Sequence, residues 1–159
     1  MAKYAEGTKT SVSNSQMEVL RILEGHGITQ HMLANDSATG THNLIFKHTG
    51  VTYKISVQMP ARDAKQFQRN GRGLARSQQE IADAWAAEVR RRWRSFLLVI
   101  KAKVIGIDDG VTTFDEAFLP YVVVNEQYET LAEVMVPRIR AAATLGEYPA
   151  LPMLGTRNP

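Results

Sequence analysis

The residues best suited to chemistry in this 159-residue chain are arginines and lysines that gather in two neighbouring segments. The planar guanidinium group of arginine donates paired, charge-assisted hydrogen bonds to phosphate and also stacks on nucleobases. The pattern therefore favours a polyanion with many phosphates as the ligand. The predicted contact residues are Arg62, Lys65, Arg69, Arg72 and Arg76 in the first segment, and Arg90, Arg91 and Arg94 in the second.

Charge is distributed unevenly along the chain, although the formal net charge is only +3. Residues 54–103 contain 12 Lys and Arg against 4 Asp and Glu, whereas the remainder contains 7 against 12. A basic region of this kind attracts a polyanion or an acidic protein surface. It can equally pair with the acidic remainder, within one chain or in an assembly, so both interpretations stay open at this point.

The aromatic residues divide into one candidate for base stacking and several candidates for the core. Phe67 lies in the polar, basic first segment, where its ring could stack on an unpaired base. Phe46 and Tyr53 alternate with polar residues at strand spacing, which predicts a core role. Trp85 and Trp93 are eight residues apart, a spacing that places both on one helical face and predicts burial against a sheet.

Signatures of catalysis are weak. The chain has no cysteine and therefore no thiolate nucleophile, and its four histidines lack metal-ligand spacing. The glycines of Asn70-Gly71-Arg72-Gly73 lack the flanking pattern of a phosphate-binding loop. Asp108 and Asp109 would need further carboxylates to hold a metal, so a turn is expected there. We predict no catalytic residue, no metal site and no cofactor.

The first sixty residues predict a helix followed by a small antiparallel sheet. Ser15 and Glu18 fit a capping box that would begin the helix. Residues 28–33 predict a first strand, and the alternating residues of 44–48 and 51–57 predict a β-hairpin.

The remainder of the chain predicts helices. Residues 60–77 have few large apolar side chains and predict a flexible basic loop. Apolar residues at intervals of three or four over 78–105 predict one helix about 42 Å long. Capping patterns at Thr113 and Thr130 predict two C-terminal helices, and Pro137 should kink or divide the second.

These elements predict an α+β fold in which an N-terminal helix and one long helix pack on a small antiparallel sheet, with C-terminal helices completing the core. Residues 1–148 are expected to form a single domain, and 149–159 a Pro-rich tail. The apolar stripe of the long helix exceeds what a short sheet can cover, so a homo-oligomer is expected. The sequence shows no apolar leader and no membrane-length apolar run, which favours a cytoplasmic location.

Four sequence motifs carry a resemblance to an uncharacterised protein family of bacteriophages and prophages. The motifs are Tyr4-Ala5-Glu6-Gly7-Thr8, Arg92-Trp93-Arg94, Leu98-Val99-Ile100-Lys101-Ala102-Lys103 and Gly110-Val111-Thr112-Thr113-Phe114-Asp115-Glu116-Ala117-Phe118-Leu119. Members accompany phage functions of DNA replication and recombination, and the resemblance therefore implies a link to nucleic acid in the host cytoplasm. It transfers no catalytic residue.

The leading hypothesis is a non-enzymatic phage protein that binds nucleic acid during DNA replication or recombination, with single-stranded DNA as the favoured ligand and no strong sequence preference. One alternative is a protein-interaction module that modulates a host or phage enzyme through the same basic helix. A metal-dependent nuclease that uses Asp108 and Asp109 is a third hypothesis.

Overall fold

A computed structural model describes residues 4–146, so the predicted tail at 149–159 lies outside the described residues. The elements in chain order are α1 (Val12–Gly25), β1 (Gln30–Asp36), β2 (Thr41–His48), β3 (Val51–Gln58), α2 (Lys65–Gln68), α3 (Gln78–Asp108), α4 (Phe114–Phe118), the 3-10 helix η1 (Leu119–Tyr121) and α5 (Leu131–Leu145). The three strands form one antiparallel sheet in the order β1-β2-β3. The predicted α+β fold class is confirmed.

The β2–β3 hairpin follows the alternation in the sequence. Thr49 and Gly50 connect the strands, and both have positive φ angles, 47° and 84°, as a type I′ turn requires. The register pairs Phe46 with Tyr53, whose rings stack with centroids 5.1 Å apart. Both side chains are buried, as predicted.

The first strand begins later than predicted. Gly27 has a φ of 75°, and the N–H of Ile28 donates to the carbonyl of Leu23 at 3.0 Å. These are the bonds of a helix C-terminal cap, in which the residue after the glycine packs back on the helix. Ile28 therefore belongs to the end of α1, and β1 begins at Gln30.

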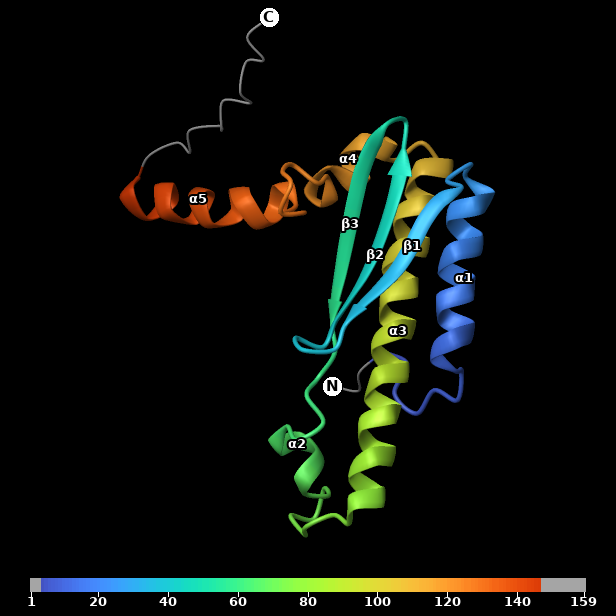
Figure 1. The fold of residues 1–159 in the computed structure, drawn as a ribbon, viewed down its shortest axis with the longest axis vertical. Coiled ribbons are helices and arrows are strands. Elements are labelled where there is room, and N and C mark those ends of the chain that lie inside the picture. The colour runs from blue at the N-terminus through green and yellow to red at the C-terminus, as the bar shows by residue number, and fades with distance from the viewer. Residues whose placement is uncertain (1–3, 147–159) are drawn as a thin grey trace, which may run out of the picture.

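The two long helices lie together on one face of the sheet (Figure 1). Trp93 of α3 is 1% exposed and packs edge-on against Phe96 and His42, with ring centroids 5.6 and 5.8 Å apart. Trp85, two turns earlier, is half-buried, and its Nε1 donates to the carbonyl of Pro60 at 2.8 Å. The prediction of a buried tryptophan face is confirmed in full for Trp93 and in part for Trp85.

Helix α1 begins before the predicted capping box. The hydroxyl of Ser11 accepts from the N–H of Asn14 at 3.1 Å and caps the helix. Ser15 lies fully buried inside the helix, where its hydroxyl donates to the carbonyl of Ser11. Glu18 binds Arg94 and Lys101 of α3. The prediction of a capping box at Ser15 is wrong. Ser15 is buried within the helix, and the Glu18 carboxylate forms ion pairs with α3.

The helix starts predicted further along the chain are confirmed. Thr113 and Thr130 each accept a hydrogen bond from the residue three positions on, whose glutamate side chain accepts in return. Helix α3 runs three residues beyond the predicted end, to Asp108, which makes it about 46 Å long. Helix α5 continues through Pro137 to Leu145, so the proline does not divide it.

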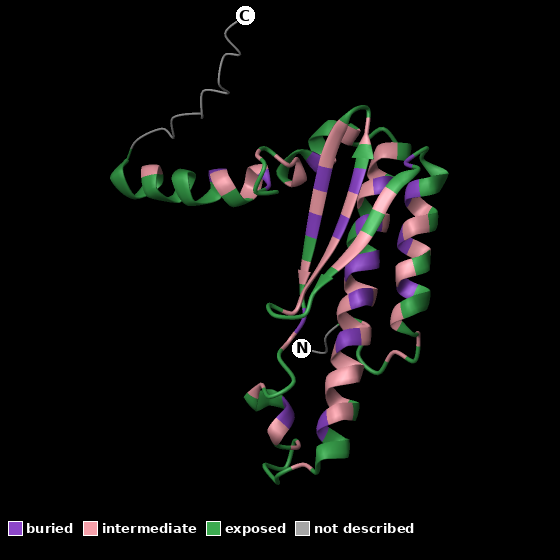
Figure 2. Ribbon diagram, in the orientation of Figure 1, coloured by how far each residue is buried: buried purple, intermediate pink, exposed green. Residues whose placement is uncertain are grey.

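Helix α5 extends away from the sheet and the paired helices (Figure 1). Its first turn is anchored by an ion pair between Glu133 and Lys54 of β3, at 3.0 Å, and by a hydrogen bond from the N–H of Leu131 to the carbonyl of Val122. Met135 is its only fully buried residue (Figure 2). The helix is therefore held to the body only near its beginning.

Candidate nucleic-acid interface

The basic segment between β3 and α3 is folded on itself. It contains the single helical turn α2, and residues Arg69 and Ala75 form an antiparallel bridge. The side-chain carbonyl of Asn70 accepts from the N–H groups of Arg72 and Leu74, both at 3.0 Å. The prediction of a loop without its own structure is therefore wrong, because a short polar turn supplies the hydrogen bonds that the backbone needs.

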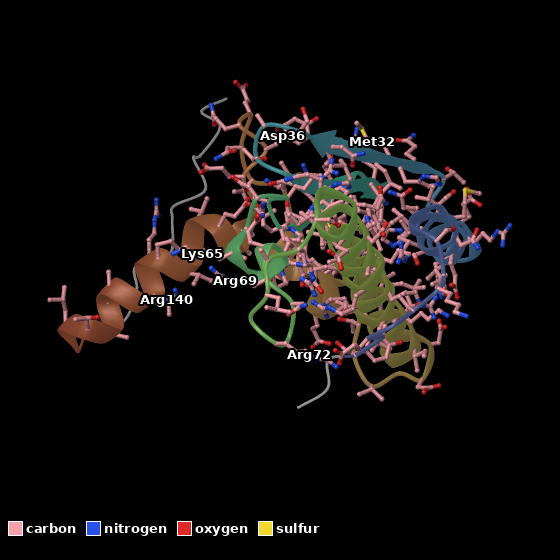
Figure 3. The ribbon with its side chains drawn as sticks, turned by 90° about the horizontal axis from the view of Figure 1, so that it is seen from below. Met32, Asp36, Lys65, Arg69, Arg72 and Arg140 are labelled. Carbon is pink, nitrogen blue, oxygen red and sulfur yellow. The ribbon has the colours of Figure 1, made fainter. Side chains whose placement is uncertain are left out.

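Four basic residues of this segment are exposed, and one of them, Arg69, also donates from Nη1 to the carbonyl of Gly73 at 2.7 Å. Arg62, Lys65, Arg69 and Arg72 are all exposed, and none forms an ion pair with another residue between 4 and 146. Figure 3 shows three of them on the segment that precedes α3. One acidic residue, Asp63, lies among them in the sequence. We call these four residues the cationic tip.

Two predicted contact residues of the segment face inward instead. Arg76 is half-buried, and its Nη1 donates to the carbonyls of Gln66 and Phe67 at 3.4 and 3.3 Å. Phe67 is 4% exposed and lines a cavity of about 390 Å³ with Ala84 and Ala87 of α3. Its ring anchors α2 to α3, so the prediction of an open stacking platform at Phe67 is wrong.

The arginines of α3 are engaged within the chain. Arg91 forms a two-pronged bond with Glu88, at 2.7 and 2.6 Å, which raises the pKa of the guanidinium. Arg94 lies 3.3 Å from Glu18, and the Nε of Arg90 donates to the carbonyl of Thr8 at 3.4 Å. The pKa of the Glu18 carboxyl is lowered, chiefly by the hydrogen bond from Lys101.

These contacts separate the two basic segments that the sequence treated as one unit. All three predicted residues of α3 are half-buried and hold other parts of the chain, whereas the cationic tip keeps its charge unpaired among the described residues. A cation already paired with a carboxylate must lose that partner before it can neutralise a phosphate. The tip is therefore the stronger candidate for anion binding.

A cavity of about 560 Å³ lies beside the tip. Arg62 and Trp85 line it, together with Met59 and the turn between β1 and β2. Asp36, the last residue of β1, also lines the cavity; it accepts hydrogen bonds from the turn, including the Thr39 hydroxyl at 2.8 Å, and these bonds lower its pKa. The volume falls in the range of small-ligand sites, and an aromatic ring and a cation in one lining suit a base and its phosphate.

The contribution of Trp85 was missed from the sequence because its spacing from Trp93 indicates only a shared helical face. The proline carbonyl that fixes its indole ring is 25 residues away in the chain, at Pro60. Arg62, two residues after Pro60, is the one sequence signal that could have linked the tip to this ring.

Of the two aspartates considered for a metal site, Asp109 lies in the predicted turn and Asp108 does not. Asp108 still belongs to α3 rather than to a turn, and its carboxylate contacts Nε2 of His26 at 3.0 Å. Asp109 caps the helix. Within residues 4–146, no group of three or more His, Asp or Glu side chains could hold a metal ion.

The contact between His26 and Asp108 predicts a pH dependence of stability. The pKa of His26 is raised above 6.5, first by the hydrogen bond to the carbonyl of Ile22 and then by Asp108. A raised pKa in the folded state means that the stabilisation is complete below pH 6.5 and is lost as the pH rises through the folded pKa. The free energy of unfolding should therefore contain a component that declines as the pH rises above 6.5.

Urea denaturation across this range measures that component, and His26→Gln should remove it. His42 acts in the opposite direction, because burial lowers its pKa and so costs stability only as the pH falls below 6.5. A pH profile for His26→Gln identical to that of the unmodified chain above pH 6.5 would contradict the assignment.

Comparisons with protein-family models, with curated proteins and with solved structures give no match to this chain. No helix among the described residues is long and apolar enough to cross a membrane.

Proposed function

We propose that the protein binds nucleic acid through the cationic tip without catalysing a reaction, with single-stranded DNA as the favoured ligand and little sequence preference. The resemblance to phage and prophage proteins supports a role in phage DNA replication or recombination, in the host cytoplasm. The observation that carries the proposal is the set of four exposed cations that no carboxylate of the described chain neutralises.

The electrostatics of the tip support backbone contacts rather than base reading. Its cations come from a short turn and a single helical turn, and no long helix or strand projects with them into a groove. Contacts of this kind neutralise phosphates regardless of sequence and release counterions. Weak sequence preference follows from that arrangement.

The cavity at Trp85 supports the preference for single strands. Its aromatic ring is half-buried and fixed by the bond to Pro60, so it offers a prepared surface to a base that is not stacked in a duplex. Stacking of one base on an aromatic side chain contributes about 1–3 kcal/mol. A duplex base would first have to unpair, which costs a few kcal/mol.

The test is a titration of a labelled oligothymidylate and of a mixed-sequence duplex of the same length at about 50 and 200 mM salt. If four phosphates are neutralised, the affinity for the single strand should fall about 50-fold over this interval, from a slope of about 0.7 per phosphate. The single strand should bind more tightly than the duplex at both salt concentrations. Absence of binding at 50 mM salt would rule out the proposal and favour a protein partner.

Trp85→Leu serves as a matched variant, because it removes the ring and leaves all four cations in place. It should retain the salt slope and lose about 5-fold to 150-fold in affinity for the single strand. Unchanged affinity, with an unchanged melting temperature, would exclude the cavity from the site while leaving the tip in place.

A further inference from the structure

The outer part of α5 is an apolar surface without a cover among the described residues. From Val136 to Leu145 every residue is exposed except Ala142, which is half-buried. Ile139 is 46% exposed and Leu145 is 72% exposed. Figure 2 shows this part of the helix almost entirely in the colour of exposed residues.

Helix α5 is poorly suited to stand alone in water. It has 15 residues, a length at which isolated helices are only marginally stable. Pro137 lies inside it and has no N–H to donate to the preceding turn, which destabilises a helix interior. Since Met135 is its only fully buried residue, contacts with the rest of the chain do not offset this cost. A second surface that packs on the outer turns of α5 would stabilise the helix and offset this cost.

The same chain carries a second uncovered apolar surface on α3. Leu98, Val99, Ala102 and Ile105 follow one another at helical spacing, and all four are exposed. Ile105 is 57% exposed. We call these four residues the α3 stripe. It spans about 10 Å along the helix, and the exposed turns of α5 span about 14 Å.

We propose that the outer part of α5 packs on the α3 stripe of a second copy of this chain, and that the exchange is reciprocal. Within one molecule the two surfaces do not meet, because α5 leads away from the paired helices (Figure 1). In a two-fold symmetric pair one rotation brings each α5 onto the other copy's α3, so that both surfaces are covered at once and no open edge remains.

Charge at the end of the α3 stripe is complementary to that of the exposed turns of α5, and Lys101, which lies beside the stripe, is paired with Glu18 of its own chain. The exposed turns of α5 carry Arg138 and Arg140 and no acidic residue. The α3 stripe leads to Asp108 and Asp109, at the end of α3 where the helix dipole is negative. Asp108 is already engaged by His26, so Asp109 is the carboxylate of this end that the two arginines of the other copy would meet.

Cross-linking tests the contact directly, because the chain contains no cysteine. Ile139→Cys and Ala102→Cys are made separately, mixed, incubated to exchange subunits and oxidised. The mixture should give a disulfide-linked pair, and each variant alone should give little or none. Met32→Cys, on the exposed face of the sheet, replaces Ala102→Cys as the control and should not cross-link with Ile139→Cys.

Each other outcome counts against the inference. A cross-link of Ile139→Cys with itself would show α5 paired with α5. A single-chain mass in sedimentation at micromolar concentration would show that no pair forms. A double mass without the mixed cross-link would place the contact elsewhere.

Glutamate substitutions give a second readout that does not depend on oxidation. Ile139→Glu and Ile105→Glu should each halve the mass measured in sedimentation, whereas Met32→Glu should leave it unchanged. All three positions are exposed in the single chain, so the helical signal in circular dichroism should stay the same apart from a loss from α5. A double mass in both α5 and α3 variants would overturn the inference.

Discussion

Trp93→Ala is expected to lower the free energy of unfolding by about 3–5 kcal/mol, the largest loss of stability from a single substitution in this chain. Trp93 is the largest fully buried side chain and lies between α3 and the sheet. Its loss would leave a cavity between the ring of His42, on β2, and that of Phe96, three residues further along α3. For a chain of this size, the melting temperature should fall by about 10 °C or more.

Met32→Ala is the control for this prediction. Met32 is 53% exposed on the open face of the sheet, so its truncation should cost less than about 1 kcal/mol. Trp93→Phe should lie between them, at about 1–2 kcal/mol. The smaller loss has a second cause, since the Nε1 of Trp93 has no hydrogen-bond partner among the described residues and its removal relieves a buried donor. Equal losses for Trp93→Ala and Met32→Ala would contradict the core assignment.

The parts of the fold that the sequence predicts are those determined by local spacing. The hairpin between β2 and β3 follows from strict alternation on either side of Thr49-Gly50, and α3 follows from apolar residues at helical intervals. The capping boxes at Thr113 and Thr130 depend on residues only three positions apart. Each of these patterns is complete within a short stretch of chain.

The errors arise where a distant segment competes for the same side chain. Glu18 fits a local capping box, but Lys101 and Arg94, more than 70 residues later, take its carboxylate. Phe67 looks stranded in a basic loop, yet the small residues Ala84 and Ala87 of α3 make room for its ring. Neither partner can be inferred from the residues near these positions.

The same competition explains which part of the predicted interface stays available. In a count of charged residues, an arginine of α3 and an arginine of the cationic tip each contribute one positive charge. In the structure Glu88 of α3 and Glu18 of α1 engage Arg91 and Arg94, whereas no residue of the cationic tip forms an ion pair within the described chain. The excess of basic residues in the middle of the chain is therefore partly structural and partly available to a ligand.

Replacing the four residues of the cationic tip by alanine together should reduce the slope of log affinity against log salt by about 3, or about 0.7 for each phosphate contact. At about 50 mM salt, affinity for the single strand should fall by two orders of magnitude or more. Stability should change little, because exposed substitutions of this kind each cost about 0.5 kcal/mol or less. Fluorescence anisotropy at several salt concentrations and a thermal melt measure the two quantities.

Arg91→Gln combined with Arg94→Gln is the matched control, because it also removes positive charge but from residues that bind carboxylates within the chain. It should lower the melting temperature, since Glu88 and Glu18 each lose a partner, and it should retain most of the salt slope. The reverse result, with the slope lost in the α3 variant and kept in the tip variant, would move the interface to α3. The comparison thus separates arginines that hold the fold together from those that are free to neutralise phosphate.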